Sequence, residues 1–172
     1  MIEKIPTKEE LHQLLNDALK EKDRTKKGWK FEVFFENLMQ KEKDFIFIFK
    51  HPLSELGEID YVYSHELQDH YFWKVSPYIC IECKNWKEPI TSTEINHLTE
   101  LVRDKGAFSC CGVYITASSY GPSAINAINY SRIRDKIIVI PVEGRHLVSL
   151  IEQGFKDFIR KLCEEKVFKK TG

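Results

Sequence analysis

The sequence lacks the features that mark membrane-spanning and secreted proteins. Its 172 residues contain no apolar run of 18, the length that a transmembrane helix needs. Residues 1–8 are polar and have no apolar stretch of the kind found in signal peptides. Only five cysteines are present, an odd number without the spacing of a disulfide framework, which favours a reducing compartment. We therefore expect a cytoplasmic protein that does not contact a membrane.

The sequence also has no net charge, because 26 Lys and Arg residues balance 26 Asp and Glu residues. This balance argues against a whole-molecule field for nucleic acid, although it leaves room for a local basic face. Hydrophobic residues make up 42% of the chain and aromatic residues 12%, which is typical of a folded protein. A chain of this length can bury a core without disulfides, and we predict one domain over residues 1–172.

Hydrophobic periodicity and turn residues predict the secondary structure. The predicted helices are 7–19, one that begins near Gly28, one that begins after Thr91, 122–132 and 145–161. The predicted strands are 45–49, 58–64, 78–84, 110–116 and 136–142. Residues 45–49 are all aromatic or β-branched, so we expect this strand to be buried. Thr91 and Glu94 have the spacing of a capping box. The charged segment 20–27 is expected to be a linker or an exposed turn.

The order of these elements predicts a mixed sheet with helices on both faces. Helices and strands alternate in the second half of the chain, which favours parallel strands. The first three strands follow one another directly, which favours an antiparallel meander. Within residues 58–64, alternation places Ile59 and Tyr61 on one face of the strand and Asp60 on the other. Residues 65–76 are an unusual segment, for which an extended hairpin is the simplest interpretation.

Two central strands of this sheet carry the residues that suggest chemistry. We expect an antiparallel register in which Ser64 lies opposite Tyr78. This register sets Asp60 opposite Glu82, and directly opposed side chains lie about 4.5–5.5 Å apart at Cβ. Glu82 and Lys84 share a face because side chains alternate along a strand. Two carboxylates that lie so close repel each other and favour a cation between them.

A divalent ion at this position would suit phosphodiester hydrolysis. Oxygen ligands suit Mg²⁺, with Mn²⁺ as a substitute, and such an ion activates water and stabilises the leaving oxygen. The candidate metal ligands are Asp60, Glu82 and the main-chain carbonyl of Cys83. Lys84 would orient or deprotonate the water and offset charge on the scissile phosphate. The alternative interpretation is a ladder of surface ion pairs on one face of the sheet.

An ordered set of short motifs extends this pattern along the chain. Its core is Gly57-Glu58-Ile59-Asp60 followed by Ile81-Glu82-Cys83-Lys84-Asn85. The further motifs are Gly28-x-x-Phe31-Glu32, Gly112-Val113-Tyr114-Ile115-Thr116 followed by Ala124, and Ile140-Pro141-Val142-Glu143-Gly144 with Leu147. The set resembles the PD-(D/E)xK nucleases and, more narrowly, the Mrr-like restriction endonucleases. The resemblance covers residues 28–154, an expected nuclease core that follows an N-terminal helical extension, residues 1–27.

The resemblance implies a restriction-endonuclease-like α/β fold, with a mixed sheet of about five strands flanked by helices on both faces. It implies an Mg²⁺-dependent DNA endonuclease in which Asp60 and Glu82 hold the metal and Lys84 is the catalytic lysine. It also implies Glu32 as an acidic helper on the second helix, and Glu36, one helical turn further, is the rival for that role. One active site cuts one strand, so cutting both strands would require a homodimer or two successive nicks.

Other functions are left open by the sequence. A catalytically inactive nucleic-acid-binding or assembly module of the same fold is one alternative, although the intact acidic pair and lysine argue against it. A zinc-binding regulatory domain would need Cys80 and Cys83 together, but residues three apart on a strand point to opposite faces. Residues 71–73 could stack on bases, but core packing or a dimer contact is the simpler interpretation. Residues 118–120 suit either a phosphate site or an ordinary turn.

Overall fold

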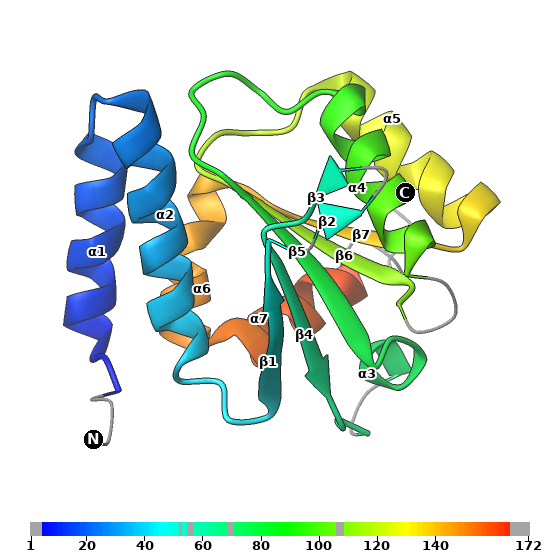
Figure 1. Cartoon of the computed structure of the whole chain (residues 1–172), viewed down its shortest axis with the longest axis horizontal. Helices are drawn as coiled ribbons and strands as arrows, with labels where there is room; N and C mark the ends of the chain where they lie inside the picture. Colours follow the sequence, from blue (N-terminus) through cyan, green and yellow to red (C-terminus); the bar gives the residue numbers. More distant parts are fainter. Residues whose placement is uncertain (1–4, 52, 55–56, 69–70, 106–108, 166–172) are drawn as a thin grey trace.

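The chain folds into a mixed sheet between two layers of helices (Figure 1). The computed structural model describes residues 5–51, 53–54, 57–68, 71–105 and 109–165, without the side chains of residues 53, 54, 71 and 72. The helices are α1 (Lys8–Lys20), α2 (Arg24–Met39), α3 (Tyr71–Val75), α4 (Ser92–Asp104), α5 (Pro122–Tyr130) with the π-helical turn η2 (Ser131–Asp135), the 3-10 turn η3 (Gly144–His146), α6 (Leu147–Gln153) and α7 (Phe155–Cys163). The strands are β1 (Phe45–Lys50), β2 (Leu53–Ser54), β3 (Gly57–Glu58), β4 (Tyr61–His65), β5 (Tyr78–Lys84), β6 (Cys111–Thr116) and β7 (Ile138–Val142).

The main sheet has the strand order β1-β4-β5-β6-β7. Strands β1, β4 and β5 are antiparallel neighbours, whereas β5, β6 and β7 are parallel. This arrangement confirms the predicted mixed topology. Ser64 pairs with Tyr78, as the sequence predicts, and the ladder continues to the pair of Tyr61 and Ile81. The short strands β2 and β3 form a separate hairpin that the sequence did not predict.

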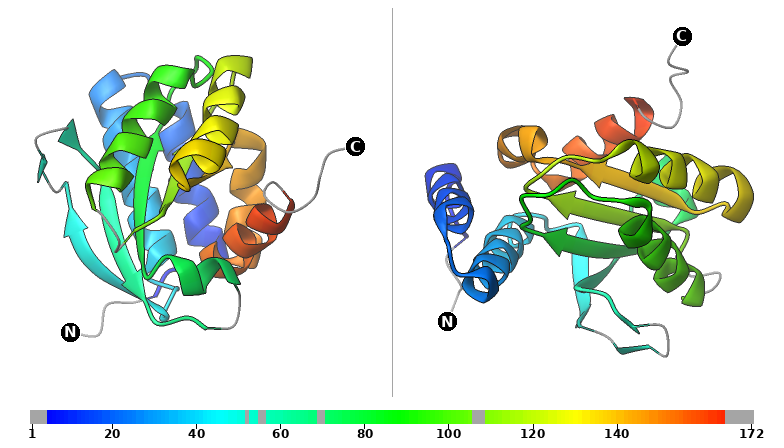
Figure 2. Two further views of the ribbon diagram at one scale, coloured as in Figure 1. Left: turned by 90° about the vertical axis from the view of Figure 1, so that its right-hand side faces the viewer. Right: turned by 90° about the horizontal axis from the view of Figure 1, so that it is seen from above.

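Two hydrophobic cores lie on opposite faces of the sheet (Figure 2). Helices α4 and α5 cover one face, and α1, α2, α6 and α7 lie over the other. Helix α1 packs against α2 and α6 and buries Leu11 and Leu15, so residues before 28 take part in the core. Cys80 and Cys83 belong to different cores and therefore point to opposite faces, as expected.

Two helix predictions need new bounds. The exposed turn predicted for 20–27 is confined to residues 21–23, because α2 already begins at Arg24, where the Asp23 side chain caps the first turn. The single helix predicted for 145–161 is divided at Gly154, whose φ of +83° ends α6 and lets α7 begin in a new direction. None of the described helices is long and apolar enough to cross a membrane.

Two strand predictions also need correction. Strand β1 lies at the edge of the sheet and is not buried, since Ile46, Phe47 and Phe49 are 58%, 53% and 59% exposed. Aromatic and β-branched residues favour an extended backbone whether or not their side chains are covered. The strand predicted for 58–64 is interrupted at Asp60, where the chain bends between β3 and β4. Ile59 and Tyr61 consequently pack in different cores rather than on one face.

Residues 65–76 contain the short helix α3 rather than an extended hairpin. Trp73 in this helix is buried and its ring meets that of Phe45 at a centroid distance of 5.5 Å, so Trp73 serves the core. Asp69 and His70 lie outside the described residues.

Candidate active site

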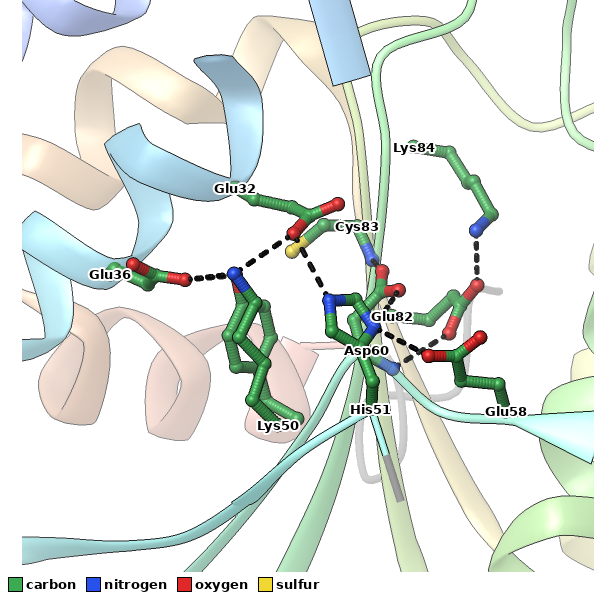
Figure 3. A network of polar contacts seen from close by, with 10 residues as sticks. Glu32, Glu36, Lys50, His51, Glu58, Asp60, Glu82, Cys83 and Lys84 are labelled. Carbon is green, nitrogen blue, oxygen red and sulfur yellow. Dashed lines mark hydrogen bonds and ion pairs between the residues drawn. The ribbon is translucent and has the colours of Figure 1, made fainter. Parts of the chain in front are cut away.

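The three residues predicted to carry the chemistry lie together where β4 begins and β5 ends (Figure 3). Asp60 directly precedes β4 and is 8% exposed, and Glu82 in β5 is 6% exposed. The main-chain N–H of Cys83 donates a hydrogen bond of 2.7 Å to Asp60 Oδ2. The N–H of Asp60 lies 3.4 Å from Glu82 Oε2, and Lys84 forms an ion pair with Glu82. The structure therefore brings both carboxylates and the ammonium group to one site, where Glu82 contacts Lys84 and the main chain of Asp60.

The bend that presents Asp60 is fixed by close contacts on both sides. The N–H of His51 donates to the Asp60 carbonyl at 3.0 Å, which ties the bend to the end of β1. Gly57, at the start of β3, has a φ of +131°, and a Cβ there would lie 2.8 Å from His97 Cε1 of α4. The positive φ favours glycine, whereas the His97 ring is the end of an exposed side chain that can move aside. The Gly57-to-Asp60 motif is thus explained by backbone geometry as well as by its carboxylates.

Burial and mutual repulsion determine the charges at this site. Burial raises the pKa of Glu82, and the charge of Asp60 raises it further. Burial also raises the pKa of Asp60, although the charge of Lys84 and the Cys83 N–H oppose this effect. For Lys84, burial lowers the pKa, but the two carboxylates outweigh burial and the net pKa is raised. Two buried carboxylates share one ammonium, so an additional cation would stabilise their charged forms.

His51 lies among three carboxylates on the α2 side of Asp60 (Figure 3). Its Nδ1 is 3.0 Å from Glu58 Oε1 and 3.9 Å from Asp60 Oδ1. Its Nε2 is 3.4 Å from Glu32 Oε2. The sequence did not single out His51, because no other histidine stands at ligand spacing from it. The residue joins the site through the turn after β1, which no periodicity in the sequence indicates.

The two rival glutamates of α2 have different surroundings. Glu32 reaches the imidazole of His51, and its charge acts to raise the pKa of Asp60. Both glutamates pair with Lys50, Glu32 at 3.2 Å and Glu36 at 2.6 Å, but among the described residues only Glu36 accepts a hydrogen bond, of 2.9 Å, from the Tyr61 hydroxyl. Glu32 therefore acts electrostatically on Asp60, while Glu36 supports the packing of β4 against α2 through the Tyr61 hydroxyl.

A cleft of about 370 Å³ opens over the carboxylates on the side of the sheet that α4 covers. Its walls include Glu58, Asp60, Glu82, Lys84, Trp86, Glu94, His97 and Tyr114. Tyr114 pairs with Glu82 across β5 and β6, so both side chains leave the same face of the sheet. Tyr114 is 1% exposed, and its hydroxyl has no hydrogen-bond partner among the described residues. A buried hydroxyl without a partner is uncommon in folded proteins, and it marks Tyr114 as a candidate that the sequence did not reveal.

A family model described as "Restriction endonuclease" matches residues 24–151 of this chain. The chain belongs to the Mrr-like restriction endonuclease family. This match confirms the resemblance drawn from the motifs. Comparison with curated proteins finds no significant match.

Two solved structures show weak similarity to this restriction endonuclease domain. One is SfsA of Pyrococcus furiosus in complex with Ca²⁺, with 15% identity and a TM-score of 0.42 over 65% of this chain and 55% of that chain. The other is the MspJI restriction endonuclease in complex with a 27-mer oligonucleotide, with 12% identity and a TM-score of 0.46 over 98% of this chain and 40% of that chain. The chain thus spans about half the length of these proteins or less.

The donor atoms of this restriction endonuclease domain suit Mg²⁺ better than zinc. Within the described ranges, no three His, Cys, Asp or Glu side chains are placed to hold an ion by themselves. Mg²⁺ needs fewer protein ligands, because it binds through one or two carboxylates and keeps several waters. Asp60 and Glu82 supply such oxygens beside an open cleft. The N–H and C=O of one strand residue point to the same side of the strand. Because the Cys83 N–H bonds Asp60, the Cys83 carbonyl also points toward the Asp60 side of β5.

Proposed function

We propose that this chain is a metal-dependent endonuclease that hydrolyses phosphodiester bonds in DNA. The observation that carries the proposal is that Asp60, Glu82 and Lys84 line one cleft, in which Lys84 forms an ion pair with Glu82. Membership of the restriction endonuclease family supports DNA as the substrate. The buried pair of carboxylates supports a divalent cation, and we propose Mg²⁺, with Mn²⁺ as a substitute.

Each residue has a proposed role in the reaction. A bound Mg²⁺ would lower the pKa of a water molecule and act as a Lewis acid on the phosphate. Asp60, Glu82 and the Cys83 carbonyl would hold the ion. Lys84 keeps its ammonium group next to Glu82, where it orients the water and offsets the charge that develops on the phosphate. Glu32 acts as a positioning residue, because it holds His51 against the Asp60 side of the site.

The cellular setting and the assembly are also proposals. The five cysteines are all free, which supports a reducing compartment such as the cytoplasm. A single site cuts one strand, so we propose that double-strand cleavage proceeds through a homodimer or through two successive nicks.

A cleavage assay on supercoiled plasmid and linear DNA tests the proposal. With Mg²⁺ the protein should cut, and with EDTA it should not. Lys84→Ala should reduce the cleavage rate by about 100-fold or more, in line with the loss of one charge that stabilises the transition state. Lys161→Ala, an exposed lysine on α7, is the control and should cut normally. Unchanged cleavage in Lys84→Ala, or no metal-dependent cleavage by the unmodified protein, would refute the proposal. Binding without cleavage would instead indicate an inactive DNA-binding module.

A further inference from the structure

A second cleft adjoins the acidic one and carries the opposite charge. Its volume is about 510 Å³, and it is lined by Lys22, Arg24, Lys27, Asn85, Trp86, Lys87 and Glu88. Trp86 lines both clefts, so they meet at this side chain. The whole chain has no net charge, yet four cations and one carboxylate gather here. The basic cleft, as we call it, is therefore a local concentration of positive charge.

The four cations of the basic cleft differ from many other charged groups of the described chain in their lack of ion pairs. None of them forms an ion pair with an Asp or Glu within the part of the chain that the structure describes. The neighbouring Lys30 behaves differently and pairs with Glu21 at 2.6 Å. The nearby Asp23 carboxylate accepts the N–H of Lys26 at the start of α2. Like charges that gather without partners repel each other, so this cluster favours an anionic ligand.

Asn85 connects the basic cleft to the catalytic strand. It directly follows Lys84, and its side-chain amide donates to the carbonyls of Ala18 at 2.9 Å and Lys27 at 3.1 Å. These bonds hold the turn between α1 and α2 at the same end of the molecule as the loop after β5 (Figure 1). Asn85 is 6% exposed, and its Oδ1 has no partner among the described residues. Its amide group therefore fixes the basic turn beside the strand that carries Lys84.

We propose that the basic cleft binds the phosphodiester backbone of the DNA strand that flanks the scissile phosphate. The inference rests on the proposed function, which places the scissile phosphate in the acidic cleft next door. Lys and Arg contacts to phosphates fix the position of a strand without reading its sequence. A strand that passes from one cleft to the other crosses Trp86. The segment between α1 and α2 is thus part of the substrate site, and Lys22 precedes the first residue of the family match.

DNA binding in EDTA tests this inference without cleavage. The probe is a fluorescein-labelled duplex of about 30 base pairs, and anisotropy gives Kd over a series of salt concentrations. Each lost phosphate contact should lower the slope of log Kd against log salt by about 0.9. Lys22→Ala/Lys27→Ala and Arg24→Ala/Lys87→Ala should each lower this slope by about 1.8 and weaken binding at least about tenfold at low salt.

Lys43→Ala/Lys161→Ala is the matched control, because it also removes two exposed lysines. Lys43 lies past the other end of α2, and the 16 residues of this helix span about 24 Å. The control should bind like the unmodified protein, and melting curves should show that all variants fold. If Lys27→Ala disturbs the packing of α2, the variant Arg24→Ala/Lys87→Ala still tests the inference.

The possible results separate this inference from the proposed function. Cleft variants that keep the original affinity and slope would overturn the inference, as would an unmodified protein that does not bind DNA in a salt-dependent way. A protein that binds through the basic cleft but never cuts would support the inference and refute the proposed activity. A protein that cuts while both cleft variants bind normally would refute the inference alone.

Discussion

Replacing Glu82 by Gln should abolish cleavage and make the metal-free protein more stable at pH 8. Glu82 is buried beside Asp60, and burial and the Asp60 charge both raise its pKa. An ionised carboxylate in such a place destabilises the folded state. Glutamine keeps the shape of the side chain and an oxygen that can accept from the Asp60 N–H, but it carries no charge.

The gain in stability depends on pH, because proton binding by Glu82 is linked to folding. Because the pKa of Glu82 is higher in the folded than in the unfolded chain, its contribution to stability is fully present below the unfolded pKa of about 4.3. That contribution is lost as the pH rises through the folded pKa. Each pKa unit corresponds to about 1.4 kcal/mol, and the ion pair with Lys84, which the variant lacks, offsets part of the gain. We expect a net gain of about 1 kcal/mol at pH 8, which for a chain of this size is about 2–4 °C in Tm.

Thermal melts in EDTA at pH 4 and pH 8 measure this gain. Glu82→Gln should melt about 2–4 °C above the unmodified protein at pH 8 and within about 1 °C of it at pH 4. Added Mg²⁺ should raise the Tm of the unmodified protein at pH 8 and leave the variant unchanged. Glu100→Gln removes an exposed carboxylate of α4 and should have no effect at either pH.

Two results would refute the electrostatic argument. One is a change in Tm that is the same at pH 4 and pH 8, because a pKa effect must depend on pH. The other is a loss of stability in Glu82→Gln at pH 8, which would mean that the pair with Lys84 outweighs the repulsion from Asp60.

Three further substitutions test other parts of the site. Tyr114→Phe removes a hydroxyl without a described partner, so the free energy of unfolding in urea should stay the same or rise by about 1 kcal/mol, whereas the cleavage rate should fall about tenfold. A loss of stability would mean that the hydroxyl is satisfied. Gly57→Ala should lower the free energy of unfolding by about 1–3 kcal/mol, because of its positive φ and the contact with His97. A change under about 0.5 kcal/mol would contradict this geometry. Glu32→Gln should slow cleavage about tenfold, while Glu36→Gln should change it less than about twofold and cost about 1 kcal/mol of stability through the Tyr61 hydroxyl. Equal effects on cleavage would mean that the two residues share the role.

Much of the arrangement of β4 and β5 follows from local sequence rules. Side-chain alternation puts Glu82 and Lys84 on one face, and the predicted register of Ser64 with Tyr78 is the observed one. The capping box at Thr91 also forms as predicted. These features depend on residues that are close in the chain or on the pairing of two neighbouring strands. The spacing of the residues in the sequence therefore determines them.

Other features depend on which elements become neighbours, and sequence periodicity does not contain that information. Strand β1 lies at the edge of the described sheet and leaves Ile46, Phe47 and Phe49 exposed, although its composition is that of a buried strand. His51 joins Asp60 only when the turn after β1 folds against α2. Asn85 holds the basic turn next to the end of β5 through bonds to Ala18 and Lys27, which lie 67 and 58 positions earlier in the chain. Tertiary folding alone determines these neighbours, because the contacts between them form only once the sheet and both helical layers are assembled.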